Sequence, residues 1–280
     1  MGVPIKGVET HYVETHVGKM QVRRGGSGPV VVYLHSATGE GEAMLLLDEL
    51  SASCEVVAPM FPGFGESEGI DEMEDMEDAV FHLLDVFDRL ELTREGQGPP
   101  TVAGLSLGAW MAVELATRYP ERVGRLVLVN PVGLFIEGAG VRDIFGRTPA
   151  EMAEDMFADQ SHPMAQMMHM LSEFRSDPTR MAEIPFEMIR PLAQTMAATA
   201  KLGWDPYLHN PKLRKRLHRV TAPTLVVRGA QDTLVPPAHA EAYAAEIPNA
   251  RLVEVDGAAH LLPLEKPSEL AQLIADFVNG

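Results

Sequence analysis

Short apolar runs recur along this chain, and the segments between them carry apolar residues at helical spacing. The runs are rich in valine and leucine and hold few polar positions. Strands that are covered on both faces have this continuous apolar character, as in a parallel sheet. The pattern therefore predicts buried parallel strands at residues 30–35, 55–60, 101–105, 125–130 and 224–229.

Helical spacing is clearest after the third of these runs. Met111 and Leu115 share one face of a predicted helix that Pro120 ends. Further helices are predicted at residues 75–90 and 267–278. Strands and helices in alternation indicate an α/β fold, with a mostly parallel central sheet and helices on both faces.

Two segments differ from the buried runs and suit the edges of the sheet. Residues 251–255 alternate between apolar and polar, as a strand exposed on one side does. Residues 7–26 resemble an antiparallel hairpin, which we expect at one edge.

The regular alternation stops between residues 133 and 219. Apolar residues there keep helical spacing, strand patterns are absent, and methionine and proline are frequent. Flexible thioethers adapt to irregular apolar space and to varied ligands. We expect residues 133–219 to form a helical cap (lid) inserted into an α/β-fold core of residues 1–132 and 220–280.

Charge and composition restrict the partners. The formal net charge of −17 disfavours nucleic acid, because most of the surface would repel phosphates. No apolar run approaches bilayer length, and the first residues lack a signal-peptide layout. We expect a cytoplasmic monomer or homodimer that acts on a small molecule, with no membrane partner. Since no metal or nucleotide motif is found, we expect no metal or other cofactor.

The stretch GLSLG places Ser106 between two glycines, each two residues away, where a strand pattern turns directly into a helical one. Such a turn needs small neighbours because helix and strand pass close together. It would project the Ser106 hydroxyl above the carboxyl edge of the sheet, next to the N–H groups that begin the helix. The position is typical of a catalytic nucleophile.

A serine hydroxyl needs a base and the base needs an orienting carboxylate. His260 follows the strand pattern at 251–255, and Asp232 follows the strand at 224–229, so both belong to the same sheet edge as Ser106. Asp256 ends the loop that carries the histidine and is poorly placed to face it, and Asn130 cannot supply a negative charge. We therefore predict Ser106, His260 and Asp232 as nucleophile, base and acid.

The order serine, aspartate, histidine, each after a parallel strand, resembles the α/β-hydrolase superfamily over nearly the whole chain. LHSATGE, FPGFGES, GAQDTLVP and AAHLLPLEKP resemble the superfamily's loops after the third strand, at the common PGFGxS turn, at the acid and at the histidine. The resemblance implies an oxyanion hole made by the backbone N–H groups of Ala37 and Leu107. Ser36, Met60 and Ala259 depart from the usual pattern, and Ser36 either alters its loop or adds a hydroxyl donor.

Acyl transfer on Ser106 is the reaction that these groups support most directly. Carboxylic esters are the expected substrates, and a lactone fits the same groups. The superfamily also includes C–C bond hydrolases of the meta-cleavage type, which usually carry tryptophan after the histidine, where this chain has Leu261. A different class is a non-catalytic ligand-binding protein on the same fold.

The cap is expected to set specificity. Its apolar residues and the acidic surface favour small to medium uncharged substrates. The predicted pocket consists of Ser36, Phe135, Ile136, Met156, Phe157, Met167, Met168, Trp204 and Leu261.

Overall fold

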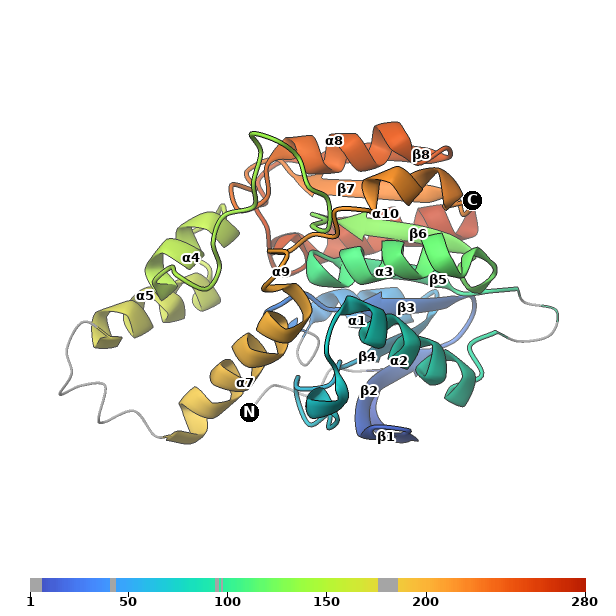
Figure 1. Cartoon of the computed structure of the whole chain (residues 1–280), viewed down its shortest axis with the longest axis horizontal. Coiled ribbons are helices and arrows are strands. Elements are labelled where there is room, and N and C mark those ends of the chain that lie inside the picture. Colours follow the sequence, from blue (N-terminus) through green and yellow to red (C-terminus); the bar gives the residue numbers. More distant parts are fainter. Residues whose placement is uncertain (1–6, 41–43, 94–95, 97, 176–185) are drawn as a thin grey trace.

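A central β-sheet organises the protein (Figure 1). The computed structural model describes residues 7–40, 44–93, 96, 98–175 and 186–280. Within these residues one sheet of eight strands has the order β1-β2-β4-β3-β5-β6-β7-β8. The strands are β1 (Val8–Thr15), β2 (Gly18–Gly26), β3 (Val30–Leu34), β4 (Glu55–Pro59), β5 (Thr101–Leu105), β6 (Arg125–Val129), β7 (Thr224–Gly229) and β8 (Ala250–Val255).

The sheet is parallel except at one edge. The strands β4, β3, β5, β6, β7 and β8 pair in parallel, whereas β1 pairs with β2 and β2 with β4 in antiparallel register. The hairpin β1–β2 forms one edge and β8 the other, as the two atypical segments predicted. All residues of β3 and β5 are buried, which accounts for their continuous apolar sequences. The predicted α/β fold class is confirmed.

Helices cover both faces of the sheet. In Figure 1, α2 and α3 lie in front of the strands and α10 lies behind them. The helix α1 packs against α10, and α3 packs against α2. These elements, with the short helices of the core, are α1 (Leu45–Ser51), η2 (Ile70–Glu72), α2 (Met76–Arg89), α3 (Leu107–Arg118), η3 (Pro120–Arg122), α8 (Pro237–Glu246), α9 (Leu262–Glu265) and α10 (Pro267–Asn279).

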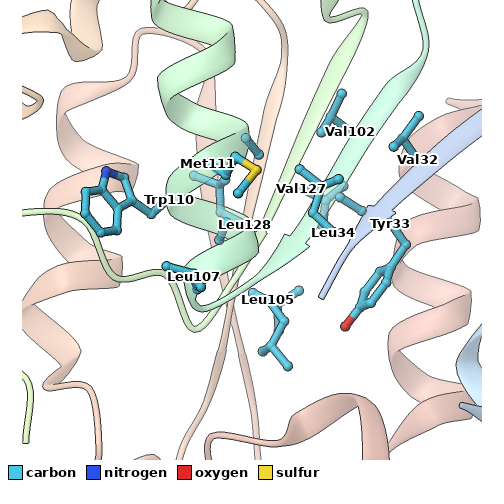
Figure 2. Packing of buried hydrophobic residues seen from close by; sticks show 14 of the residues in the cluster. Val32, Tyr33, Leu34, Val102, Leu105, Leu107, Trp110, Met111, Val127 and Leu128 are labelled. Carbon is cyan, nitrogen blue, oxygen red and sulfur yellow. The ribbon is translucent and has the colours of Figure 1, made fainter. Parts of the chain in front are cut away.

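The core that matters most for the site lies between α3 and the middle of the sheet. Val32 of β3, Val102 of β5 and Leu128 of β6 are fully buried and lie on the same face of the sheet as Gly104, which approaches α3. Figure 2 shows Val32, Val102 and Leu128 together with Met111 and Leu107 of α3. Their packing fixes the start of α3 against the carboxyl ends of the central strands.

Between β6 and β7 the chain leaves the sheet. Its described residues there form α4 (Pro149–Met156), α5 (Pro163–Arg175), α7 (Phe186–Gly203) and η4 (Arg214–Arg219), and none of the eight sheet strands. The helices α4, α5 and α7 project to one side of the sheet (Figure 1). Proline begins α4 and α5, and Thr148 caps α4 by accepting a hydrogen bond from the Glu151 N–H.

The two ends of this helical segment meet. Gly133 forms an isolated parallel bridge with His209, its N–H donates to the Leu208 carbonyl and its carbonyl accepts from the Asn210 N–H, each at 3.0 Å. The short helix η4, which follows, packs on α3 and α8 of the core. We therefore propose that the cap runs from residue 133 to about residue 210, a shorter segment than the 133–219 expected from the sequence, because Pro211 onwards lies against core helices.

None of the helices in the described part of the chain combines the length and the apolar character needed to cross a bilayer.

One buried side chain of the core is poorly satisfied. His82 of α2 is buried, and neither of its ring nitrogens has a hydrogen-bond partner among the residues that the structure describes. Burial and the nearby His16 ring lower the pKa of His82 to about 4, while Asp85 acts in the opposite direction. His82 is therefore neutral in the folded protein near pH 7, and its two nitrogens lose hydration without replacement.

Replacing His82 by leucine is expected to stabilise the fold, most strongly in acid. Below pH 6.5 the unfolded chain binds a proton that folded His82 does not, so the wild type loses stability as the pH falls towards 4. We expect the leucine variant to be more stable by about 1 kcal/mol near pH 8 and about 3 kcal/mol near pH 4.5, measured by urea denaturation. His11→Leu on exposed β1 is the control. A stability gain that is independent of pH would contradict the assignment of a neutral buried imidazole.

Candidate active site

Ser106 occupies a sharp turn between β5 and α3. Its φ of 53° and ψ of −108° are unfavourable for a residue with a Cβ. The Ser106 N–H donates to the Val129 carbonyl at 2.9 Å, which ties the turn to β6. A Cβ on Gly104 would lie 2.4 Å from the Gly108 carbonyl carbon, and a Cβ on Gly108 would lie 2.2 Å from the Leu34 oxygen. The spacing GLSLG therefore follows from the close approach of helix and sheet.

His260 and Asp232 form a buried hydrogen-bonded pair. His260 Nδ1 lies 2.8 Å from Asp232 Oδ2, and both side chains are almost fully buried. The other carboxylate oxygen, Oδ1, accepts the N–H groups of Leu234 at 2.9 Å and Val235 at 3.0 Å. With Nδ1 protonated towards the carboxylate, Nε2 is the nitrogen that can accept a proton. Asp256, the other carboxylate near the histidine in sequence, is exposed.

Asn130, which lacks the charge needed for the acid, has a different position in the site. Its Nδ2 donates to the carbonyls of Ala259 at 3.1 Å and His260 at 2.8 Å. Its Oδ1 accepts the Gly229 N–H at 2.9 Å. One amide thus joins the ends of β6 and β7 to the histidine loop. Its place after a parallel strand was the only sign of this in the sequence.

The histidine loop is also attached to the cap. Leu261 donates its N–H to the Met156 carbonyl at the end of α4, at 3.0 Å. Glu265 accepts the Ala259 N–H through Oε2 at 2.7 Å and the Ala158 N–H through Oε1 at 2.8 Å. The backbone around His260 is therefore held by core and cap together.

A small cavity lies between Ser106 and His260. Its volume of about 10 Å³ is that of roughly one water molecule. The described residues that line it include no lysine and no arginine, and most are apolar. They are Ser36, Ala37, Thr38, Ser106, Leu107, Val132, Val141, Ile144, Met156, Leu208, Leu234 and His260.

Two backbone N–H groups at this cavity are free to donate. In the described part of the chain no acceptor is found for the N–H of Ala37 or for that of Leu107, the first residue of α3. Leu107 is buried and Ala37 is half-buried, and N–H groups that are removed from water are normally paired. Their position beside Ser106 suits the oxyanion hole that the resemblance implies.

The structure brings only part of the predicted pocket to the cavity, namely Ser36 and Met156. Phe135 and Trp204 are 58% and 61% exposed, and Met167 is 47% exposed. The other four residues pack elsewhere, because they contact the core or other side chains instead of the cavity. Ile136 and Met168 are half-buried against the core, Phe157 stacks on His162, and Leu261 is buried outside the cavity lining.

Sequence reasoning missed half of the cavity lining. Four of the missed residues come from the loops after β3 and β6, and two from the return of the cap and the loop after β7. They are Thr38, Val132, Val141, Ile144, Leu208 and Leu234. Thr38, Val132 and Leu234 lie just past strand ends, and this position is the signal that could have identified them.

The loop after β3 resolves the two alternatives for Ser36. Its hydroxyl donates to Glu40 Oε2 at 2.7 Å and accepts the Thr38 N–H at 3.1 Å, so the side chain holds its own loop. His35 Nδ1 lies 2.7 Å from the Ser36 carbonyl, and its Nε2 accepts the Phe61 N–H at 3.0 Å. Burial lowers the pKa of His35, which fits a neutral ring that links two loops.

The other two departures from the superfamily pattern are buried. Met60 packs in the core, and the Ala259 N–H donates a hydrogen bond to the Glu265 carboxylate. The backbone of Ala259 does not have a positive φ, so this position does not require a glycine.

Comparison with known proteins identifies the family. The α/β hydrolase fold family matches residues 29–267, and the chain belongs to it. The chain is 28% identical over 283 residues to 2-hydroxymuconate semialdehyde hydrolase of Pseudomonas sp. (strain CF600), covering 97% of this chain and 91% of the relative. It is 31% identical over 191 residues to pimeloyl-[acyl-carrier protein] methyl ester esterase of Aromatoleum aromaticum, covering 64% and 74%.

Solved structures show the same fold. A serine hydrolase involved in carbazole degradation superposes with a TM-score of 0.75 at 18% identity, covering 97% of this chain and 99% of that one.

Exchanging Asn130 for aspartate tests the clamp on the histidine loop. The carboxylate keeps the acceptor for Gly229 but replaces the donor to the two carbonyls with a repelling charge. We expect the free energy of unfolding to fall by about 2 to 4 kcal/mol in urea denaturation. Asn279→Asp, whose Nδ2 donates to one exposed carbonyl, is the matched control and should change it by less than about 0.5 kcal/mol. Equal effects in both variants would contradict the clamp.

Proposed function

We propose that the protein is a serine hydrolase that cleaves carboxylic esters through an acyl-enzyme on Ser106. The observation that carries this proposal is the buried Asp232–His260 pair, which shares one uncharged cavity with Ser106. A base oriented by a carboxylate, next to a serine on a strained turn, is the arrangement that activates a hydroxyl for attack on a carbonyl.

The reaction would proceed in two similar halves. Ser106 attacks the ester carbonyl while His260 Nε2 takes its proton, and Asp232 stabilises the imidazolium. The N–H groups of Ala37 and Leu107 stabilise the oxyanion, with each donor worth about 3 kcal/mol. His260 then protonates the leaving alcohol, and water repeats the steps on the acyl-enzyme.

Small to medium uncharged substrates are proposed for this site. The described cavity lining offers no cation to pair with a substrate anion, and the net charge of −17 disfavours the approach of anions. A buried anion without a partner is costly. A lactone, which is a cyclic ester, fits the same argument.

Cleavage of a C–C bond is the second candidate. It is supported by the similarity to 2-hydroxymuconate semialdehyde hydrolase over nearly the whole chain. Two features count against it. Leu261 occupies the position after the histidine, and the described cavity lining lacks a cation for a muconate carboxylate.

Labelling by a fluorophosphonate separates these enzymes from a ligand-binding protein of the same fold. We expect covalent labelling of the wild type at Ser106, located by peptide mass, and loss of ester hydrolysis by about 10⁵-fold to 10⁶-fold in Ser106→Ala. Ser27→Ala, in the exposed turn between β2 and β3, should label and hydrolyse like the wild type. A wild type that does not label would favour the non-catalytic class.

A substrate panel tests the charge preference and the bond that is cleaved. We expect kcat/KM for a neutral p-nitrophenyl ester to exceed that for the p-nitrophenyl monoester of succinate by about tenfold or more. The preference should persist in 0.5 M NaCl, because salt screens the surface charge but not the cavity. Faster turnover of the anionic ester would refute the preference, and faster turnover of 2-hydroxymuconate semialdehyde than of any ester would support the second candidate.

A further inference from the structure

The geometry points to Glu40 as a positioning residue for the oxyanion hole. Glu40 ends the stretch HSATGE, five residues after His35, and it has no part in the chemistry described above. This inference rests on the proposed function, because an oxyanion hole matters only if Ser106 attacks a carbonyl.

The Glu40 carboxylate collects four donors. Its Oε1 accepts the Ser36 N–H at 2.8 Å and the Tyr33 hydroxyl at 3.0 Å. Its Oε2 accepts the hydroxyls of Ser36 at 2.7 Å and Thr38 at 2.9 Å. A carboxylate offers about four lone-pair sites, so these donors fill it. The loop after β3 is therefore held around the Glu40 carboxylate, which can only accept hydrogen bonds.

Tyr33 anchors this carboxylate to the sheet. Its side chain belongs to β3 and is almost fully buried. Burial first, and then the charge of Glu40, raise the pKa of Tyr33 well above 10, so that its hydroxyl remains a donor. The loop is thus connected through Glu40 to the rigid centre of the fold.

Ala37 lies between the two residues that Glu40 holds. Ser36 and Thr38 are bound to Glu40 and to each other, since the Thr38 N–H donates to the Ser36 hydroxyl at 3.1 Å. On the cap side, the Thr199 hydroxyl of α7 lies 3.4 Å from the Ala37 carbonyl. The peptides on both sides of Ala37 are therefore held, which fixes its N–H at the cavity that Ser106 shares.

The same contacts explain the departure at Ser36. A glycine there could donate only its N–H to Glu40, whereas serine adds a hydroxyl donor to Glu40 and an acceptor for Thr38. Charge-assisted hydrogen bonds of this kind are about twice as strong as neutral ones. In this chain the side chains of Ser36, Thr38 and Glu40 therefore hold the conformation of the loop after β3, at a position where relatives usually have glycine.

Glu40→Gln tests the inference. The amide keeps the size of the side chain but offers one acceptor oxygen, and its NH₂ faces hydroxyl and N–H donors. We expect kcat per active site to fall about tenfold or more with KM changed less than threefold, because an oxyanion donor acts mainly in the transition state. Binding of a boronic acid, which forms a tetrahedral adduct on Ser106, should weaken by a similar factor. The pH midpoint of kcat/KM should stay that of the wild type, since His260 and Asp232 are unchanged.

Fluorophosphonate titration gives the number of active sites, so loss of folded protein is not counted as loss of rate. Glu121→Gln, an exposed carboxylate in η3, is the matched control and should behave as the wild type. Ser36→Ala retains the backbone bond to Glu40 and should reduce kcat about threefold, which keeps the test decisive if Glu40→Gln does not fold.

The outcomes separate the two proposals. A kcat per labelled site and a boronate affinity within twofold of the wild type in both variants would overturn the role of Glu40 while leaving the proposed function standing. A wild type that neither labels nor hydrolyses esters would overturn the proposed function, and the inference with it.

Discussion

The close approach of α3 to β3 and β5 is the constraint on which the site depends. Helix and strands come so near that Gly104 and Gly108 leave no room for a Cβ, and Ser106 between them must adopt a left-handed backbone. The buried side chains around α3 hold this strained turn in place (Figure 2). The result is that a hydroxyl and the first N–H groups of a helix emerge together at the carboxyl edge of the sheet.

The other parts of the site reach this edge on loops, and a polar side chain holds each loop by its backbone. Asn130 and Glu265 hold the peptides around His260, the two N–H groups that Asp232 accepts fix its carboxylate, and Glu40 holds the loop of Ala37. Backbone groups buried near a cavity need partners. When a side chain is the partner, one hydrogen bond both satisfies the backbone group and positions the functional group that the loop carries.

The sequence predicted what depends on local pattern. Continuous apolar runs located each predicted strand to within one residue, because strands covered on both faces admit few polar residues. The pairing of His260 with Asp232 followed from the rule that parallel strands end at one edge. The hydrogen bonds of Asn130 to the histidine loop span 129 and 130 positions, so no local pattern encodes them. Nor could apolar character select the cavity residues of the cap, because Phe135, Met167 and Trp204 are apolar yet exposed.

The cap rests on both halves of the site. The end of α4 binds the histidine loop through the Met156 carbonyl, and Asp155 of the same helix accepts a hydrogen bond from Thr233, next to the acid, at 3.2 Å. The helix α7, a separate arm in Figure 1, contacts the opposite half, where its Thr199 hydroxyl meets the Ala37 carbonyl. The cavity of about 10 Å³ near Ser106 leaves no room for an ester. Admitting a substrate there must displace cap residues whose neighbours hold the proposed acid, base and oxyanion loop. In the proposed function, substrate fit and catalytic geometry therefore depend on the same contacts.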